Sequence, residues 1–312
     1  MSNSLVISYF TNSQIDKIRW DDAIEKASNG MAYAYTWYLD AVFPNWSALI
    51  SENYEYVFPI TINSKFGLSY WYSPIYTMQL GIFSSNEITN ETINSFFQTI
   101  PKKITSIDFS VNPSLLIIPK GFTSTLKKCQ VVYLSATYQD LQQRYSSNLK
   151  RNLSKANKAE LRIEESTDIT SVVDLFKAHR GIHIKKVTQQ DYDKLYQLIE
   201  NTLKVEKGFI YSVYQDELLL ASCFFSITNN RIIYHKGGVN EIGKKLGAMH
   251  FLIDFLIKKH AESSYTLDFG GSSIEAVKRF NQNFSKDEYV FLQLQRGNKM
   301  IKVIRKWRDK LK

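Results

Sequence analysis

The sequence predicts an α+β protein of two tandem domains, each with a mostly antiparallel central sheet flanked by helices. Three observations predict it. The chain of 312 residues is long enough to form two hydrophobic cores. Residues 208–239 contain three apolar runs separated by turns at 215–216 and 228–230, which is the pattern of an antiparallel meander. A glycine-containing loop, a long helical pattern, a short strand, a short helix and a last strand then follow, up to Arg296.

The first half of the chain has comparable content. Strands are predicted at 4–10, 47–51, 56–62, 103–110 and 122–135, and helices at 15–27, 34–43 and 88–99. This order suggests two copies of one fold, although no residue-level repeat is visible. We therefore expect an N-terminal domain over residues 1–145 and a C-terminal domain over residues 146–312.

Composition indicates an ordinary globular protein of the cytoplasm. Hydrophobic residues make up 44% of the chain, and the mean hydropathy is −0.26. The N-terminus lacks the pattern of a signal peptide, and no apolar run reaches the length of a membrane span. Cys129 and Cys223 both lie in apolar surroundings, which favours buried free thiols over a disulfide.

The net charge of +9 is concentrated at the C-terminus, where residues 296–312 contain eight basic residues and one acidic residue. Met300, Ile304, Trp307 and Leu311 share one face of a predicted helix there. One interpretation is a helix docked by its apolar face, with lysines that keep it soluble. The other is a surface for a polyanion, either tRNA or an anionic membrane at its inner face.

A second basic segment lies at 138–160, where Lys150, Arg151, Lys155 and Lys158 occur with few acids. Arg151, Lys155 and Lys158 share one helical face. They form either a solvated surface or an anion-binding surface at the domain junction. In the latter case Arg151 and Lys155 are the binding residues.

The predicted loop at 237–247 is the strongest candidate for phosphate binding. Its glycines allow backbone amides to approach a ligand, and the helix that follows presents free N–H groups. Gly243, Lys244, Lys245 and Gly247 are the residues we expect to hold a donor phosphate without a metal ion. An ordinary turn before a buried helix is the alternative. His250, Asp254 and Lys258 form a polar line on that helix, and we interpret this line as structural.

Metal and covalent-nucleophile chemistry has no sequence support. The chain contains no GxxxxGK[ST], HExxH, CxxC or GxSxG motif. His179 and His183 are four positions apart, but Gly181 interrupts them and no third ligand is near.

Three segments resemble a known family. LDFGGSSIEAVKRFNQNFSKDEY is similar to the closing motif of the Fem-type (FemABX) aminoacyltransferases and their tandem-GNAT relatives, in which Asp-Phe-x-Gly precedes a helix and a Phe-Lys-x-x-Phe-Gly element. SNLKRNLSKANKAEL is similar to the basic helix of that family, with Arg151, Asn152 and Ala156 matching and Glu160 in place of a glycine. SPIYTMQLGIF in the first half extends the resemblance.

The resemblance implies two GNAT-like domains, the first binding the acceptor and the second the donor. The donor would be acyl-coenzyme A or aminoacyl-tRNA, because the coenzyme A loop pattern is degenerate at 244–249. The donor would align along the strand at 234–238, whose residues are Tyr234, His235, Lys236, Gly237 and Gly238. The acceptor would lie against the aromatic segment that contains Tyr76, Thr77 and Gln79, which could equally be packed in the core.

The closing motif departs from the family at its lysine. If Phe280 and Phe284 are the two family phenylalanines, Asn281 stands at the lysine position and Ser285 at the glycine. Lys278 or Arg279 would then stabilise the oxyanion, and Asn281 would contact the acceptor. Asp108, near a strand end, is a candidate base or a capping carboxylate.

These features together predict transfer of an activated acyl group onto an amine of a small or cell-wall-precursor-like acceptor, as in peptidoglycan assembly. Two alternatives remain open. One is a catalytically inactive GNAT-fold binding module, and the other is an anion- or RNA-binding interaction protein that uses the basic tail.

Overall fold

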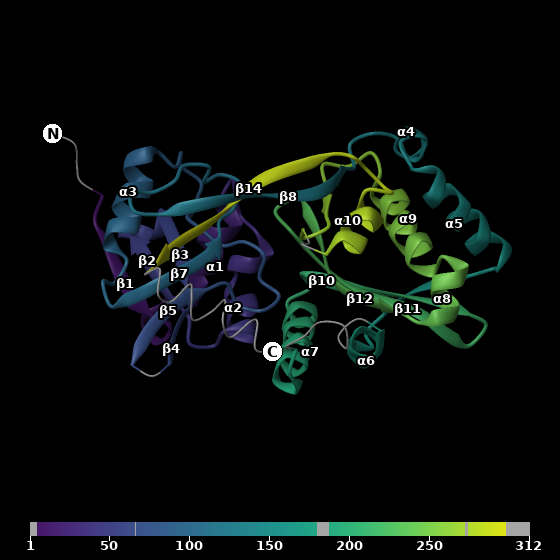
Figure 1. Cartoon of the computed structure of the whole chain (residues 1–312), viewed down its shortest axis with the longest axis horizontal. Coiled ribbons are helices and arrows are strands. Elements are labelled where there is room, and N and C mark those ends of the chain that lie inside the picture. The colour runs from purple at the N-terminus through teal and green to yellow at the C-terminus, as the bar shows by residue number, and fades with distance from the viewer. Residues whose placement is uncertain (1–4, 66, 180–186, 272–273, 298–312) are drawn as a thin grey trace. The chain divides into compact units, whose positions relative to one another are not determined.

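The computed structural model describes residues 5–65, 67–179, 187–271 and 274–297 (Figure 1). The chain divides into two compact units, one built from residues up to 127 together with the chain from 290 onward, and one from residues 128–289. The predicted α+β class, with mostly antiparallel sheets flanked by helices, is confirmed. The expected boundary at 145/146, between an acceptor side and a donor side, stays a prediction.

The first unit packs its helices on two groups of strands. Strands β1, β2, β3 and β6 are paired antiparallel in that order, and β4, β5, β7 and β14 follow one another in a second group. The core between them contains Trp71 stacked on Phe109, with ring centroids 4.1 Å apart. The elements are β1 (Ile7–Thr11), α1 (Lys17–Lys26), α2 (Thr36–Val42), β2 (Ser47–Ser51), β3 (Tyr56–Ile60), β4 (Ile62–Lys65), β5 (Leu68–Tyr72), β6 (Phe83–Ser84), α3 (Asn90–Thr99), β7 (Ile104–Ser110) and β14 (Glu288–Gly297), with short 3-10 turns at Asn12–Gln14, Ala32–Ala34 and Glu52–Tyr54.

The second unit has strands in the order β8-β13-β12-β11-β10-β9, antiparallel except for the parallel pair β12 and β13. The predicted meander is β10 to β12. The elements are β8 (Thr123–Tyr133), which begins in the first unit, then α4 (Tyr138–Gln143), α5 (Ser147–Lys158), β9 (Arg162–Ser166), α6 (Ile169–His179), α7 (Gln189–Lys204), β10 (Gly208–Gln215), β11 (Leu218–Thr228), β12 (Arg231–Val239), α8 (Glu241–Leu246), α9 (Ala248–His260), β13 (Thr266–Asp268) and α10 (Glu275–Asn281).

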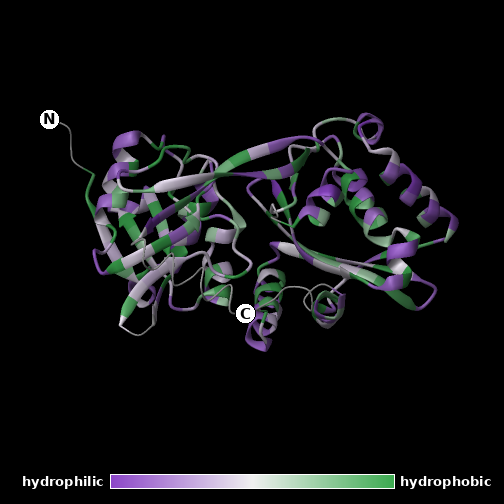
Figure 2. Ribbon diagram, viewed as in Figure 1, coloured by the Kyte–Doolittle hydropathy of each residue, from purple (hydrophilic) through white to green (hydrophobic). Residues whose placement is uncertain are grey.

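Helices cover both faces of the β10–β12 meander. Helices α5, α8 and α9 lie on one face and α6 and α7 on the other (Figure 1). Helix α9 buries one apolar side, including Leu252, Ile253 and Leu256, because these positions recur at the helical period. Hydrophobic residues follow the strands and the inner sides of the helices, whereas α5 is largely hydrophilic (Figure 2). None of the described helices is long and apolar enough to cross a bilayer.

Strands β12 and β13 pair over three residues and then separate. Their parallel register runs from Arg231 opposite Thr266 to Ile233 opposite Asp268. Directly after Ile233, β12 has a bulge, because Phe225 lies opposite Tyr234 and Phe224 opposite Lys236, which leaves His235 as the extra residue. A bulge bends a strand and increases its twist. The bulge therefore marks the point where β12 leaves β13.

The bulged His235 is buried on the sheet. Its Nε2 lies 2.7 Å from the Ser226 hydroxyl, and its ring stacks on Phe224 at 5.1 Å. Burial, reinforced by the charge of Lys236, lowers the pKa of His235 to about 3. The imidazole is therefore neutral at physiological pH and belongs to the structure of the bulge.

The segment 237–247 is not the glycine-rich loop that the sequence predicts. It consists of the end of β12 and the short helix α8, and four of its glycines lie where backbone or side chains approach closely. A Cβ on Gly238 would lie 2.3 Å from the Leu175 carbonyl carbon on α6, and one on Gly243 would lie 2.7 Å from the Leu220 oxygen. Gly247 adopts a left-handed conformation with φ 78°, which ends α8 and starts α9.

Gly238→Ala should destabilise the second unit by about 1–3 kcal/mol, because α6 must move away from β12 to admit the methyl group. The free energy of unfolding in urea measures this loss. Gly121→Ala is the control, since that glycine has φ +83° and no atom within 4 Å of the added Cβ, so only the backbone cost applies. Equal stability of Gly238→Ala and the wild type would contradict the close packing of α6.

The low pKa of His235 makes stability depend on pH. The unfolded chain binds a proton at this histidine near pH 6.5, whereas the folded protein binds it only near pH 3, so stability falls as the pH drops through this window. The loss approaches about 1.4 kcal/mol per pH unit below 6.5. His235→Gln keeps a hydrogen-bonding group for Ser226 but cannot titrate. Urea unfolding between pH 7 and 4.5 should therefore give a steeper decline for the wild type, and parallel curves would refute the assignment.

Candidate active site

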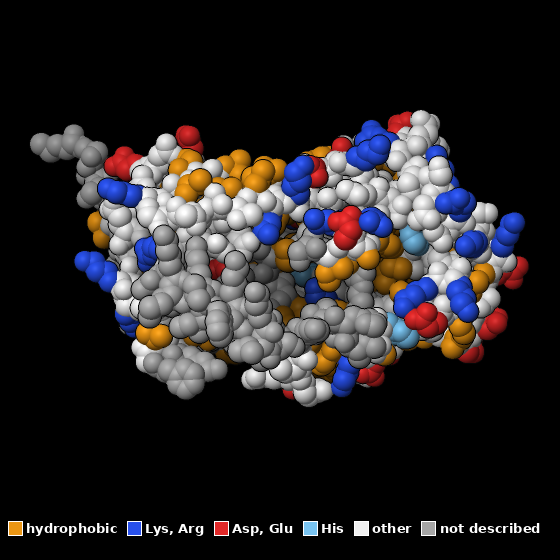
Figure 3. Space-filling model, viewed as in Figure 1, with side chains coloured by type: hydrophobic (Ala, Val, Ile, Leu, Met, Phe, Trp, Pro, Cys, Tyr) orange, Lys and Arg blue, Asp and Glu red, His pale blue; other side chains and the backbone are white. Residues whose placement is uncertain are grey.

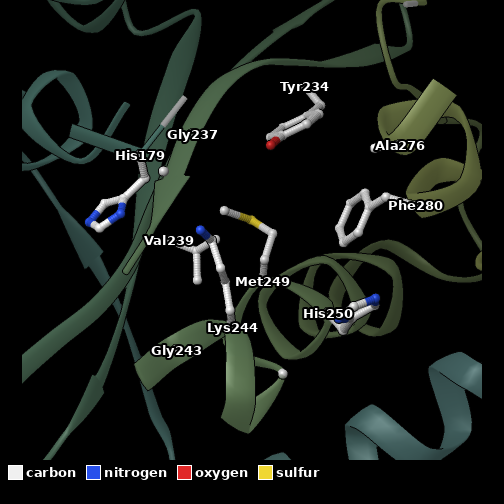
Figure 4. A pocket seen from close by; sticks show the side chains of 12 residues that line it. His179, Tyr234, Gly237, Val239, Gly243, Lys244, Met249, His250, Ala276 and Phe280 are labelled. Atoms are coloured by element: carbon white, nitrogen blue, oxygen red, sulfur yellow. The ribbon is translucent and has the colours of Figure 1, made fainter. Parts of the chain in front are cut away.

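A pocket of about 400 Å³ lies in the second unit beside β12, beyond the point where it separates from β13 (Figure 4). Five elements form its walls: the far half of β12, helix α8, the start of α9, the end of α6, and α10. The lining residues are His179, Tyr234, Gly237, Gly238, Val239, Gly243, Lys244, Gly247, Met249, His250, Ala276 and Phe280.

Six of the residues predicted to bind the donor line this pocket. Tyr234, Gly237 and Gly238 belong to β12, and Gly243, Lys244 and Gly247 to the segment after it. The other three predicted donor residues do not line it. His235 is buried in the bulge, while Lys236 is half-buried and Lys245 is exposed outside the pocket.

Helices α8 and α9 begin differently, and the difference matters for anions. In α8 the Asn240 side chain accepts from the Gly243 N–H at 2.7 Å, so the start of this helix is already capped. No side chain in the described chain caps α9, which begins at Ala248 after Gly247. Gly247, Met249 and His250 place this N-terminus in the pocket wall. Its uncapped N–H groups and the positive end of its dipole favour an anionic ligand.

One exposed acid limits the positive charge at the edge of the pocket. Glu241 lies 2.5 Å from Lys244 Nζ and 3.8 Å from His179 Nδ1. The hydrogen bond from Lys244 holds the pKa of Glu241 below its usual value. The pair is exposed, so an incoming phosphate can replace Glu241 as the partner of Lys244 at little cost.

His250 is a pocket residue that the sequence interpretation assigned to structure. Its ring lies 4.8 Å from the Phe280 ring between centroids, and its Nε2 is buried with no hydrogen-bond partner in the described chain. Burial lowers the pKa of His250 to about 4, so the ring is neutral at physiological pH. A buried nitrogen without a partner is costly, which suggests that a ligand supplies the partner.

The two residues that share the polar line with His250 have structural contacts. Asp254 accepts from the Tyr138 hydroxyl at 3.0 Å, and Lys258 Nζ lies 5.6 Å from the centroid of the same ring. The spacing of four along the helix therefore could not distinguish His250, which lines the pocket, from Asp254 and Lys258, which do not. The nearby Gly247 could have identified His250 as a site residue, because a glycine that starts a helix places His250 in the first turn of α9.

Helix α10 carries three further predicted residues, none of which lines the pocket. Arg279 is exposed and donates from Nε to Glu275 at 3.4 Å, and Lys278 is half-buried. Asn281 is completely buried, and neither its side-chain oxygen nor its nitrogen has a partner in the described chain. Their roles in oxyanion stabilisation and acceptor binding stay predictions.

Asp268, from the Asp-Phe-x-Gly segment, holds β12 and β13 together. It is fully buried, accepts from Arg231 at 2.6 Å and Tyr289 at 2.9 Å, and also accepts from the Gly270 N–H at 2.7 Å. The Cys129 thiol lies 3.0 Å away, and burial raises the pKa of that thiol. The charge is thus compensated on every side, as a buried carboxylate requires.

Four predicted residues lie in the first unit. Asp108 is half-buried and accepts from the side chains of Gln293 at 2.6 Å and Gln295 at 3.1 Å. Thr77 and Gln79 are buried. Tyr76 has φ +70°, an uncommon conformation for a bulky residue, and its carbonyl accepts from the Tyr38 hydroxyl. Such strain often marks functional sites, and the acceptor role of this segment stays a prediction.

Helix α5 confirms the predicted basic helix over its length, with a break before it at residues 144–146. Lys150, Arg151, Lys155 and Lys158 are exposed, and none has an ion pair within the residues that the structure describes. Lys150 and Lys158 line a shallow polar depression, whereas Arg151 and Lys155 lie outside it. The basic tail from Asn298 and the residue His183 lie outside the described residues.

Comparison with known proteins shows what the chain is similar to. Residues 143–279 match the acetyltransferase (GNAT) domain family. No curated protein matches the sequence. The fold is similar to the crystal structure of FemX, with a TM-score of 0.68 at 11% identity, covering 91% of this chain and 96% of that one.

Two further solved structures have a similar fold. The C-terminal domain of a putative lysylphosphatidylglycerol synthetase from Agrobacterium fabrum gives a TM-score of 0.60 at 11% identity, covering 91% of this chain and 92% of that one. L-PGS from Bacillus licheniformis gives 0.51 at 11% identity, with coverage of 81% and 84%. The resemblance inferred from the sequence motifs is thereby supported in two ways: residues 143–279 match the acetyltransferase (GNAT) domain family, and the fold of the chain is similar to that of FemX.

Proposed function

We propose that the protein is an N-acyltransferase that moves an activated acyl group onto an amine, and that the pocket beside β12 binds the donor. The single observation that carries the proposal is the pocket itself. It lies where β12 leaves β13, next to the uncapped start of α9, within the GNAT domain. A GNAT domain implies an acyl-coenzyme A type of co-substrate, and the degenerate loop keeps aminoacyl-tRNA as the second candidate.

The wall residues suggest how a donor would lie. Phosphate oxygens would face the start of α9 and Lys244, where N–H groups and one ammonium meet. The apolar arm of the donor would lie between Met249 and Phe280, and a polar donor atom would bond His250. The strand edge at Tyr234 to Gly238 would then align the acyl group, as an added strand does.

The chemistry requires little of the protein beyond alignment. The lone pair of the acceptor amine attacks the acyl carbon, its proton passes to a base or water, and the bond to the thiol or ribose oxygen of the donor breaks. The transient oxyanion needs a backbone N–H or a cation. Lys278 or Arg279 is our candidate for the cation and Asp108 for the base.

The acceptor is proposed to be an amine on a small molecule or on a sugar peptide like a cell-wall precursor. In the first unit the candidate contacts are Tyr76, Thr77 and Gln79. In the second unit the candidate contact is Asn281, and the exposed cations Arg151 and Lys155 would hold the anionic part of the acceptor. This acceptor class is what the sequence resemblance to the Fem-type family implies, and FemX has a similar fold.

Location is proposed to be cytoplasmic, with the basic tail near tRNA or the inner face of an anionic membrane. Two other functions would be distinguished by assay. Donor binding without transfer to any amine would indicate an inactive binding module, which the buried Asn281 at the lysine position favours. Polyanion binding that survives pocket substitutions and weakens steeply with salt would indicate an interaction protein.

Lys244→Ala should raise the donor KM about three- to tenfold, because the variant lacks the ammonium that contacts the donor phosphate at the pocket edge. Lys245→Ala is the matched control, since the neighbouring lysine is exposed outside the pocket and should leave the KM unchanged. Steady-state transfer from acetyl-coenzyme A and from aminoacyl-tRNA, each with a panel of amines, provides the measurement. No turnover with any pair would reject the transferase proposal.

His250→Phe should weaken donor binding about tenfold while leaving the stability of the free protein equal or higher. The reason is that Nε2 has no partner in the described chain, so an apolar ring removes a desolvation cost that only the donor offsets. His260→Phe, which changes a half-buried histidine outside the pocket, is the control. Donor titration and thermal unfolding of the free protein measure the two effects. A large loss of stability with unchanged donor affinity would show that His250 is structural.

A further inference from the structure

The first unit exposes a run of aliphatic side chains at the tip of a loop between β7 and β8. Leu116 is 52% exposed, Ile117 40% and Ile118 51%. Hydrophobic side chains gather along the upper edge of this unit in the space-filling view (Figure 3). Single exposed aliphatic residues are normal on a soluble protein, but three in succession on an irregular loop are not explained by packing.

The loop is held firmly on both sides of this tip. Leu115 is completely buried and its N–H donates to Asn112 at 3.1 Å, while the Asn112 side chain bonds the Ile82 carbonyl at 3.0 Å. On the other side Pro119 is buried, and the Phe122 N–H donates to its carbonyl at 3.1 Å. The tip is therefore presented outward by a rigid frame.

Phe122 fixes this frame to helix α3. Its ring packs edge-on against Phe97, with centroids 5.1 Å apart, and both rings belong to the core of the first unit. Two turns thus close the loop, and a core aromatic pair anchors its end. Because the exposed residues lie between these anchors, they cannot fold back into the core without breaking it.

The charged residues that flank the tip in the sequence are all basic. Residues 109–139 contain Lys120, Lys127 and Lys128 and no aspartate or glutamate. Lys128 pairs with Glu288, but Lys120 is exposed beside the tip. Lys102 and Lys103 are also exposed, a few residues after Phe97, which packs on Phe122. Aliphatic side chains beside exposed lysines are the combination that binds an anionic bilayer.

We propose that the aliphatic tip, Leu116 to Ile118, inserts into the interface of a membrane that contains anionic lipid, with Lys120 facing the headgroups. A bilayer is the occupant that fits best, because the tip projects outward and its lysines complement negative headgroups. This inference does not depend on the transferase proposal, and it uses neither the donor pocket nor the basic tail.

Vesicle co-sedimentation tests the proposal on the full chain. Binding to mixed phosphatidylcholine and phosphatidylglycerol vesicles should fall at least about tenfold when Leu116, Ile117 and Ile118 are all replaced by Ser. The matched control replaces Ile18, Leu68 and Leu218 by Ser, three aliphatic residues that are exposed elsewhere by 85%, 51% and 47%. The control should bind like the wild type. Unchanged binding of the tip variant would overturn the proposal and assign any membrane affinity to other surfaces.

A site-specific label shows whether the tip itself enters the bilayer. Cys129 and Cys223 are completely buried, so Ile117→Cys introduces one accessible thiol for an environment-sensitive fluorophore. A blue shift with phosphatidylglycerol vesicles, weaker with phosphatidylcholine alone and weaker for Lys120→Gln, is the expected result. The same label at Ile18→Cys should not respond.

A second copy of the chain is the other molecule that could cover the aliphatic tip. Sedimentation velocity of the wild type and the tip variant distinguishes it from a bilayer. A wild-type dimer that becomes monomeric in the tip variant, together with no fluorophore response to vesicles, would replace the bilayer with a self-association surface and overturn the proposal.

Discussion

The buried carboxylate of Asp268 is the interaction on which the candidate site depends. Its ion pair with Arg231 joins the last paired residue of β13 to the first residue of β12, over the short stretch where these strands run together. Removing one partner would leave a charge buried without compensation, which is among the most costly changes in a protein interior. The pair thus fixes the place from which the strands separate.

The bulge at His235 and the ion pair between Asp268 and Arg231 act on the same junction. The ion pair keeps the strands together up to Ile233, and the bulge turns β12 away directly afterwards. Helices α9 and α10 then line the space beside the released strand. A binding pocket arises here because two strands are held at one end and unpaired at the other, which needs no ligand to maintain it.

Much of the fold could be predicted from the sequence, because apolar periodicity reports directly on burial. The predicted meander at 208–239 is confirmed as β10 to β12. The prediction of a loop at 237–247 was wrong, because a glycine in a sequence indicates backbone freedom and close packing equally well. Gly238 and Gly243 are required by contacts with Leu175 and Leu220, which lie far away in the sequence. The site residue His250 was missed for a related reason, since periodicity identifies a helix face but not what that face meets.

The order of the strands along the chain also constrains how the protein is made. Strand β14 pairs with β7, and Gln293 bonds Asp108 across 185 positions of sequence. The second unit is continuous between residues 128 and 289, so all its strands and helices emerge from the ribosome before the strand that completes the first. The edge of β7 must therefore stay without β14 until the chain has been synthesised as far as Gly297, because the two strands are so far apart in the sequence.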